Sequence, residues 1–414
     1  MRSFSLVSAL VSLALLSACT DEGEGDNSDG GSPPSTGGSP PSDGGSGAMS
    51  NDGGGGAGGG SGGEGGSGGA APLQCLADSV ASEFFTINGD DLCIVQTFEA
   101  AGLELPSYGT TPTWGAHGGP LTFAPNGANT SLTLTRWSKS GTTLTAADTN
   151  VALTGVPAGA FFGSIAVESD ATGAACADEH VVSVGWSGTP FDSQGAIVTI
   201  TPGDDAVSTT ATGVFGMASV GSSVFYTGLS EVAGPTNGVV GLYAAATEAC
   251  DAGLVTGGAV ETGWGLATGP AAADLDGNLF AILTDYLTGR QLIHGYRAED
   301  LAGGGALVGT ELADLEGYGD AFAAVVPAGA EPGLLVLQPN AGKAGLNQDV
   351  VAVEYSSAGG TLSPGLTKTL LTLAEADKNI TLMTDDDGNL WVGVSIAGDT
   401  PSTTFFVMAR PPAD

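Results

Sequence analysis

The chain has 414 residues and carries 9 Lys and Arg against 45 Asp and Glu, which gives a formal net charge of −36 at pH 7. Nucleic-acid binding needs clustered cations that neutralise phosphates, so this composition excludes a basic nucleic-acid groove and disfavours electrostatic docking onto anionic lipid. Charged residues are only 13% of the chain, below the usual share of about 25%. Gly, Ala, Ser and Thr take their place, which suits short strands and turns better than long helices.

Residues 1–18 are predicted to be a lipoprotein signal peptide. Arg2 supplies a positive start, and the apolar run Phe4–Leu16 has the length of a signal-peptide core but is too short to span a membrane stably. The run ends Leu16-Ser17-Ala18-Cys19, which resembles a bacterial lipobox. An ordinary secretory signal with a chance cysteine is the alternative.

The lipobox implies that a peptidase cuts before Cys19 and that this cysteine then carries acyl chains such as palmitate. The two residues before the cut must be small, as Ser17 and Ala18 are. More than one acyl chain is needed for lasting anchorage, so we expect a membrane-anchored protein. Thr20 stands where Asp retains lipoproteins at the inner membrane in the better-known systems. Thr20 therefore predicts that the protein is located at the outer membrane, and it does not distinguish the periplasmic side from the cell-surface side.

Residues 19–73 begin with the lipidated cysteine and continue as a linker rich in Gly, Ser and Pro, without any aromatic residue, Lys or Arg. Such a segment cannot bury a core, so we expect it to be disordered. For a flexible chain of this length the mean reach is about 40 Å. The sequence therefore predicts a folded domain held off the membrane by a tether.

Four cysteines remain once Cys19 is assigned to the anchor: Cys75, Cys93, Cys176 and Cys250. An even number in an exported, oxidising compartment favours two disulfides. Cys75–Cys93 closes a short loop and is the first choice, which leaves Cys176–Cys250 as the remainder. Zinc bound by four thiolates is the alternative, and the lack of a C-x-x-C spacing disfavours it.

Residues 74–414 are predicted to form one repeat domain, because the segment exceeds the usual size of a single hydrophobic core. An aromatic residue followed by Gly recurs at steps of about 50 residues, as repeat architectures require. A second element, Asp274-Leu-Asp-Gly-Asn-Leu-Phe280, recurs as Asp385-Asp-Asp-Gly-Asn-Leu-Trp391 and puts a sixth repeat start near Glu375. The aromatic-Gly pairs begin at Trp114, Phe162, Phe215, Trp264 and Tyr318.

The repeats read as short strands joined by hairpins, since Asp-Gly and Gly-Asn between apolar runs favour tight turns. Clear strands are predicted at Leu132–Trp137, Leu292–Tyr296 and Val350–Tyr355. Four strands in each repeat of about 50 residues are typical of a β-propeller. We therefore predict an all-β fold, a single propeller of six blades with four antiparallel strands each. Seven blades, and an array of β-sandwiches, remain alternatives.

The last predicted repeat ends after its third strand, Phe405–Met408. The strand Ile94–Phe98 near the start of the domain is predicted to supply the fourth and to close the ring. Such closure removes open sheet edges.

The Asp-x-x-Gly-Asn-Leu-[Phe/Trp] element resembles the repeat of bacterial NHL-like and two-component-sensor-type propellers, in two of the six predicted repeats. The resemblance implies the propeller shape. Members of those families bind proteins, sugars or small ligands, or hydrolyse lactones, so it does not choose a function.

The aromatic-Gly pairs are expected to begin the innermost strands, where their rings would surround the mouth of a central channel. Such rings stack on sugars or apolar ligands, but rings between strands also pack one sheet against the next, and we favour packing. His117 lies in the same motif, although a lone histidine is more often structural. The candidate ligand-binding residues are Trp114, His117, Phe162, Phe215, Trp264 and Tyr318.

Asp385, Asp387 and Asn389 are the candidate metal ligands, because calcium takes hard oxygen ligands at alternate positions. The positions at which a calcium-binding EF-hand loop needs Gly and Glu hold Leu390 and Ile396 instead, so a plain hairpin turn is the favoured interpretation. No cofactor other than this candidate calcium is predicted.

The sequence therefore predicts an outer-membrane lipoprotein whose propeller serves as a binding or scaffold module at the cell envelope. The expected partners are the membrane, through the lipid anchor, and an envelope protein or a carbohydrate ligand, but no nucleic acid. The alternative is a propeller hydrolase or lyase, with or without calcium, acting at the channel mouth. No catalytic residue is predicted, and the enzyme is the less favoured of the two.

Overall fold

The structure is a computed structural model, and its described residues all belong to the second of the two units into which the chain divides, Gly68–Asp414. The predicted signal peptide, Cys19 and the linker lie outside the described residues, as do Cys176, Cys250 and Trp264. The described residues are 74–76, 82–89, 91–105, 112–154, 156–157, 160–170, 180–187, 194–200, 206–212, 214–220, 223–229, 238–244, 255–261, 271–285, 290–297, 300, 309–314, 318–325, 332–339, 349–357, 361–374, 379–396 and 401–411.

Strands β1 to β25 make up the regular structure of these residues. After β1 (Phe85–Ile87) and β2 (Cys93–Ala101) come five runs of four strands, in which each strand pairs antiparallel with the next. The first three runs are β3 (Thr113–Gly115), β4 (Gly119–Pro125), β5 (Ser131–Ser140) and β6 (Thr143–Ala152); β7 (Phe161–Asp170), β8 (His180–Ser187), β9 (Gln194–Ile200) and β10 (Ala206–Thr212); and β11 (Val214–Val220), β12 (Ser223–Leu229), β13 (Gly238–Ala244) and β14 (Val255–Glu261). The other two are β15 (Ala271–Ala273), β16 (Asn278–Asp285), β17 (Arg290–Arg297) and β18 (Thr310–Asp314); and β19 (Tyr318–Val325), β20 (Gly333–Pro339), β21 (Asp349–Ser356) and β22 (Ser363–Leu373). The three strands predicted most clearly fall within β5, β17 and β21.

The last run has three strands, β23 (Asn379–Thr384), β24 (Leu390–Ile396) and β25 (Ser402–Ala409). Its fourth strand comes from the start of the domain, because β2 pairs antiparallel with β25 and places Phe98 opposite Phe405. The prediction that this early strand completes the last repeat is therefore confirmed. A single parallel pairing, Glu99 with Thr143, then joins β2 to β6, and β1 extends the β19–β22 sheet by pairing with β22.

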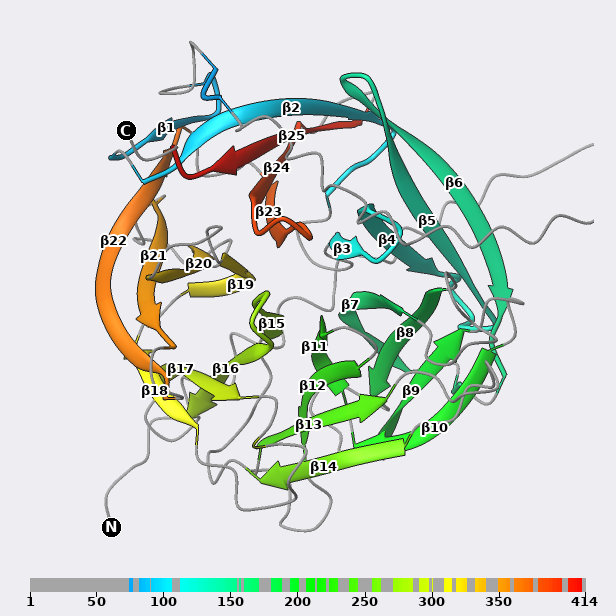
Figure 1. Cartoon of the computed structure of the whole chain (residues 1–414). Coiled ribbons are helices and arrows are strands. Elements are labelled where there is room, and N and C mark those ends of the chain that lie inside the picture. The colour runs from blue at the N-terminus through cyan, green and yellow to red at the C-terminus, as the bar shows by residue number, and fades with distance from the viewer. Residues whose placement is uncertain are drawn as a thin grey trace, which may run out of the picture. The chain divides into compact units, whose positions relative to one another are not determined.

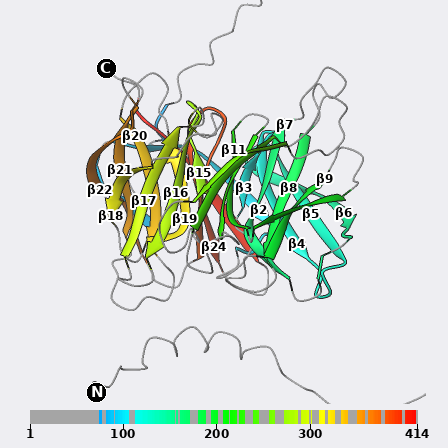
Figure 2. The same ribbon diagram turned by 90° about the horizontal axis from the view of Figure 1, so that it is seen from below.

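The sheets follow one another in a nearly closed ring (Figure 1). The first strands of successive runs contact in cyclic order, β3 with β7, β7 with β11, β11 with β15, β15 with β19, β19 with β23, and β23 with β3. These strands lie nearest the centre, and β6, β10, β14 and β22 lie at the outside. Figure 2, turned by 90°, shows the strands running across the thickness of the ring. The all-β prediction is confirmed, and the arrangement is propeller-like.

The aromatic-Gly pairs mark irregular starts of the central strands. Phe162, Phe215 and Tyr318 lie at or near the beginning of β7, β11 and β19, and in each case the pairing with the second strand shifts register there. A glycine in a strand commonly marks such a bulge, where one strand carries an extra residue. The predicted position of these pairs on the innermost strands is confirmed for the described residues.

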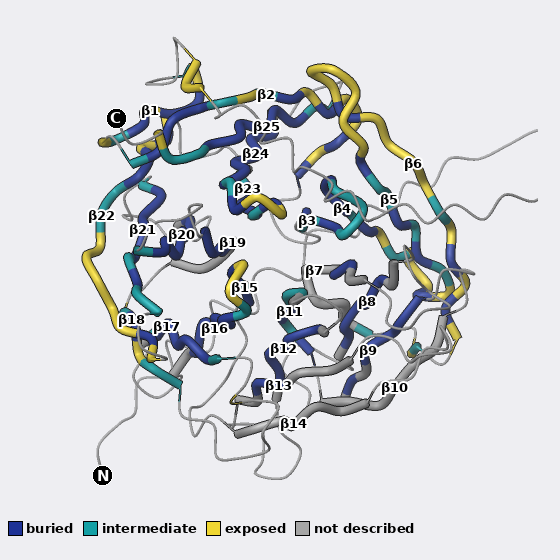
Figure 3. Tube along the Cα trace, in the orientation of Figure 1, coloured by how far each residue is buried: buried dark blue, intermediate teal, exposed yellow. Residues whose placement is uncertain are grey.

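The hydrophobic core lies between neighbouring sheets. Leu334 and Val350 of one sheet, for example, share a cluster with Val392 and Met408 of the next. Burial is deep along strands such as β16, β17, β20 and β24, whereas β6 and β22 carry long exposed stretches (Figure 3). Side chains that face the joint between two sheets are therefore held in place from both sides. Among the described residues, no helix combines the length and the apolar character needed to cross a membrane.

Candidate functional site

The tight turn after β3 carries two of the predicted binding residues, Trp114 on the strand and His117 in the turn. Gly118 adopts a positive φ of 81°, which L residues with a side chain rarely do, and its N–H donates to the carbonyl of Gly115 at 2.9 Å. This turn leads the chain into β4 and points the two side chains at different neighbours.

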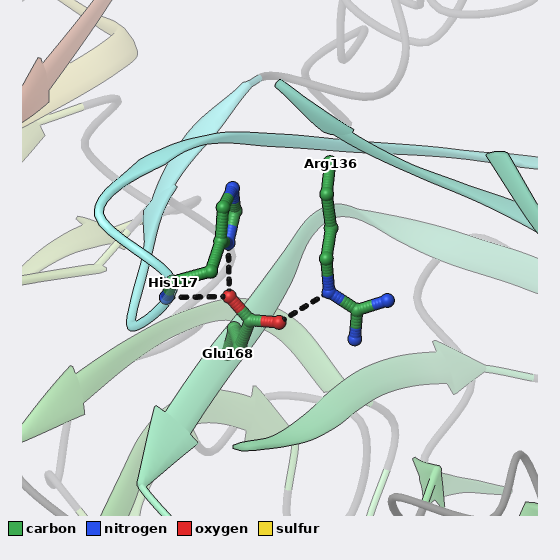
Figure 4. Close-up of polar contacts among 3 residues, drawn as sticks. All are labelled: His117, Arg136 and Glu168. Atoms are coloured by element: carbon green, nitrogen blue, oxygen red, sulfur yellow. Dashed lines mark hydrogen bonds and ion pairs between the residues drawn. The ribbon is translucent and has the colours of Figure 1, made fainter. Parts of the chain in front are cut away.

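His117 and Arg136 converge on a buried carboxylate, Glu168 of β7 (Figure 4). The Glu168 side chain is 0% exposed, and its Oε2 accepts the backbone N–H of His117 at 3.1 Å and contacts the Nδ1 of the same residue. Its Oε1 accepts the Nε–H of Arg136, on β5, at 2.7 Å. Sequence reasoning found His117 and missed the other two residues.

These partners stabilise the ionised form of Glu168. Burial alone would raise its pKa, but the hydrogen bonds and charge of His117, together with the hydrogen bond from Arg136, outweigh burial and lower the pKa from 4.5 to about 2. Glu168 is therefore ionised at neutral pH, and the Nδ1 of His117 donates to it. The Nε2 of His117 is buried and has no hydrogen-bond partner among the described residues.

Gly115 allows the close approach of these groups. A Cβ at this position would lie 2.5 Å from the Oε2 of Glu168 and 2.6 Å from the Nδ1 of His117. Real Cβ atoms essentially never make contacts this short to neighbouring groups, so a side chain here would displace the pair. The glycine of the aromatic-Gly pair thus has a local role in the site.

The cluster offers two chemical possibilities. A carboxylate that holds one imidazole nitrogen fixes the orientation of the other, an arrangement that suits acid–base chemistry. The Arg136 side chain is 29% exposed, and its terminal Nη groups make no hydrogen bond to the described residues, so they are free to contact an anionic group. The burial of the free His117 nitrogen favours positioning over catalysis.

The ring of Trp114 packs into an aromatic cluster rather than standing alone. Its centroid lies 4.9 Å from that of Trp391 on β24, and Trp391 stacks on Phe98 of β2 at 5.1 Å. The Nε1 of Trp114 is buried and has no hydrogen-bond partner among the described residues. Trp114 thus joins the first run of strands to the last, as the packing interpretation predicts.

The remaining candidate rings are described only in part. Phe215 is half-buried on β11. Phe162 and Tyr318 lie in β7 and β19, but their side chains are outside the described residues, as is the whole of Trp264. The structure therefore places Trp114 on β3 and His117 in the turn that follows it, and the ring of five aromatic side chains stays a prediction.

The Asp385 loop forms the hairpin turn between β23 and β24. The Oδ1 of Asp385 accepts the backbone N–H groups of Asp387 and Asn389 at 3.1 and 2.8 Å, and its Oδ2 accepts the Asn389 amide and the Nε1–H of Trp391 at 3.1 and 2.9 Å. Gly388 takes the positive φ of 77° that the turn requires. The described residues contain no group of three or more His, Cys, Asp or Glu placed to hold a metal ion. Calcium binding by Asp385, Asp387 and Asn389 stays a prediction.

Asp274 organises the equivalent turn between β15 and β16. Its carboxylate accepts the backbone N–H groups of Asp276 and Asn278 at 3.0 and 2.8 Å, and it also accepts the hydroxyl of Tyr355, on the next sheet, at 2.8 Å. Burial raises the pKa of Asp274 and that of Tyr355. The repeated element is therefore a turn that also ties a sheet to an aromatic side chain.

Replacing Asp385 by Ala is expected to lower the free energy of unfolding by about 2 kcal/mol, because it leaves the buried Trp391 Nε1–H without an acceptor and removes the hydrogen bonds of the turn. Urea unfolding measures the loss, and the exposed neighbour Asp386→Ala is the matched control. Repeating both unfolding measurements with added calcium and with a chelator tests whether the loop binds the metal. A chelator that destabilises the wild type but not Asp385→Ala would favour the calcium site over the plain turn.

The disulfide predicted first, Cys75–Cys93, is present. It links a residue at the start of the described chain to the first residue of the closing strand β2. The second predicted bridge, Cys176–Cys250, falls outside the described residues.

No protein-family model matches this chain, and no curated protein matches it in sequence. Solved structures with a similar fold include the Dos1 propeller, at 12% identity and a TM-score of 0.41, covering 71% of this chain and 66% of that chain. Hydrazine synthase from Kuenenia stuttgartiensis matches at 14% identity and a TM-score of 0.41, with 71% and 77% covered. A mutant of AofleA from Arthrobotrys oligospora matches at 12% and 0.39, with 83% and 99% covered. At these identities and TM-scores we take no function from them.

Proposed function

We propose that the protein is a lipid-anchored envelope lipoprotein whose β-propeller is a ligand-binding or scaffold module. The observation that carries the proposal is the order of parts along the chain. A lipobox ending at Cys19 precedes a Gly-rich linker, and the linker leads into a ring of sheets whose closing strand is the first long strand of the domain. A ring on a tether suits recognition at a membrane surface, and the outer membrane is the proposed location.

The proposed propeller has six blades. Five blades are the consecutive runs that begin at β3, β7, β11, β15 and β19, and the sixth is β23–β25 completed by β2. The cyclic contacts of the six first strands support this count over seven. The equivalent turns at Asp274 and Asp385 support the proposed kinship with NHL-like and two-component-sensor-type propellers.

Replacing Cys19 by Ala is expected to move the protein from the membrane fraction to the soluble fraction, since the acyl chains are the proposed means of anchorage. Cell fractionation followed by immunoblotting measures the shift, and incorporation of labelled palmitate should be lost with the same change. The matched control is Thr20→Ser, which keeps the acylated cysteine. Persistent membrane association of Cys19→Ala would refute the anchor.

A propeller hydrolase or lyase is the second candidate, and the contact between Glu168 and His117 is the observation in its favour. A carboxylate-oriented imidazole is a common acid–base arrangement. The test is a screen of ester, lactone and polysaccharide substrates with the wild type and His117→Gln. If the wild type turns over a substrate and His117→Gln does not, at unchanged thermal stability, the enzyme is favoured. Equal turnover by both proteins would show that His117 takes no part in the reaction.

A further inference from the structure

The ammonium group of Lys139, near the end of β5, lies over three aromatic rings from three different strands. Its Nζ is 4.9 Å from the ring centroid of Trp114 on β3, 5.1 Å from that of Trp391 on β24, and 6.0 Å from that of Phe98 on β2. Each distance is within the range of a cation–π contact, which is about 6 Å. The closure of the ring is what assembles these rings, because β2 and β24 belong to the last run of strands and β3 to the first.

Lys139 makes these contacts in a chain rich in carboxylates. The protein has 45 Asp and Glu against 9 Lys and Arg, and other described cations are paired: Arg136 with Glu168, and Lys368 with Asp91 and Glu354 at 2.7 Å each. No carboxylate of the described residues lies within ion-pair distance of Lys139. Among the described residues, the contacts that hold this ammonium are those with the three rings, and an exposed lysine side chain can also leave them.

The same cluster also contains an unsatisfied hydrogen-bond donor. The Nε1–H of Trp114 is buried without an acceptor among the described residues, which is uncommon for an indole donor in a folded protein. Trp114 is also only half-buried, whereas Trp391 and Phe98 are fully buried. The cluster thus presents a half-buried ring, with a buried donor that no described residue satisfies, beside a position already suited to a cation.

We propose that Phe98, Trp114 and Trp391 form a cation cage for a quaternary ammonium ligand, and that Lys139 occupies this cage while no ligand is bound. An external trimethylammonium group makes the same contacts with less desolvation than a primary ammonium, and a hydroxyl or other oxygen near it would meet the free indole donor. Lys139 competes from within the chain at a high effective concentration, so it sets the affinity for the ligand. This inference rests on the proposed binding role of the propeller and names its ligand class.

The test uses choline as the probe and 3,3-dimethyl-1-butanol, its uncharged isostere, as the control, with the full chain in a non-ionic detergent. Binding is followed by tryptophan fluorescence and by saturation-transfer NMR of the choline methyl groups. We expect Lys139→Ala to bind choline about tenfold more tightly than the wild type, because its own competitor is gone. Lys139→Ala/Trp114→Leu should lose the binding, and the uncharged isostere should bind none of the three proteins.

Choline that binds Lys139→Ala no more tightly than the wild type would overturn the proposal, as would equal binding of choline and its isostere. Lys139→Met, which keeps the length of the side chain, is the second variant, and unfolding midpoints show that each protein is folded. The choline result is independent of the fractionation of Cys19→Ala, so each experiment can refute its own proposal without affecting the other.

Discussion

Replacing Glu168 by Gln is expected to lower the free energy of unfolding by about 3 kcal/mol, the cost of breaking a buried ion pair from one side. Both carboxylate oxygens of Glu168 accept hydrogen bonds, from His117 on one side and from Arg136 on the other. A glutamine has one oxygen and one NH₂ group, so one of these donors must face another donor. The charge that offsets Arg136 is lost as well.

Urea unfolding at neutral pH measures this loss, and the matched control is Glu104→Gln, at an exposed glutamate in the segment that follows β2. The control is expected to stay within about 0.5 kcal/mol of the wild type, as exposed substitutions usually do. Equal unfolding midpoints for Glu168→Gln and the wild type would show that the cluster contributes no net stability.

The same cluster makes the stability of the wild type depend on pH in acid. The folded pKa of Glu168, about 2, is below the unfolded value of 4.5. A depressed pKa stabilises the folded state fully above the unfolded pKa, and this contribution is lost as the pH falls from about 4.5 toward 2. The wild type should therefore lose more stability over this window than Glu168→Gln does, so the difference between them narrows in acid.

Removal of the Cys75–Cys93 bridge is expected to be the other large effect, about 3 kcal/mol for a loop of this length. The two cysteines are 18 residues apart, and the loop between them contains β1, which pairs with β22. Cys93 is also the first residue of β2, which pairs with β25 and closes the ring. Without the crosslink, the unfolded chain gains freedom and the closing strand has one restraint fewer.

The double variant Cys75→Ser/Cys93→Ala is a better test than a reductant, because a reductant would also act on the predicted bridge between Cys176 and Cys250. Urea unfolding gives the change in stability, and hydrogen exchange should speed up in β1, β2 and β25 before it does in β12. Uniform exchange in all strands, with an unchanged midpoint, would mean that the bridge does not support closure. Peptide mapping of the wild type checks the pairing itself.

The local features of the fold could be predicted from short-range patterns. The two Asp-x-x-Gly-Asn elements predict turns because the turn geometry depends on residues within the element itself, as the Asp385 hydrogen bonds show. The closing strand could be predicted because the last predicted repeat ends after its third strand, and Ile94–Phe98 at the start of the domain is a strand that can supply the fourth. The Cys75–Cys93 bridge could be predicted from the short separation of two cysteines in a chain whose N-terminal segment predicts export.

The site could be predicted only in part, because its contacts join distant strands. A glutamate in a strand is expected to face solvent. Glu168 is buried instead, because the turn after β3 and the Arg136 side chain of β5 meet its carboxylate. One signal was present: Arg136 and Lys139 are two of only 9 cations in a chain of net charge −36, which sets them apart from their neighbours. Their partners could not be read from spacing.

The sequence alone was enough for the all-β class, the repeat, the turn at each Asp-Gly-Asn element and the expectation of an anchor at Cys19, because each depends on neighbouring residues or on composition. The tertiary structure decided which side chains meet where the ring closes. Phe98, Trp114 and Trp391 come from three strands, and only the pairing of β2 with β25 and the contact of β23 with β3 bring their rings around Lys139. Contacts of this kind follow from how sheets pack around a ring, which no local pattern encodes.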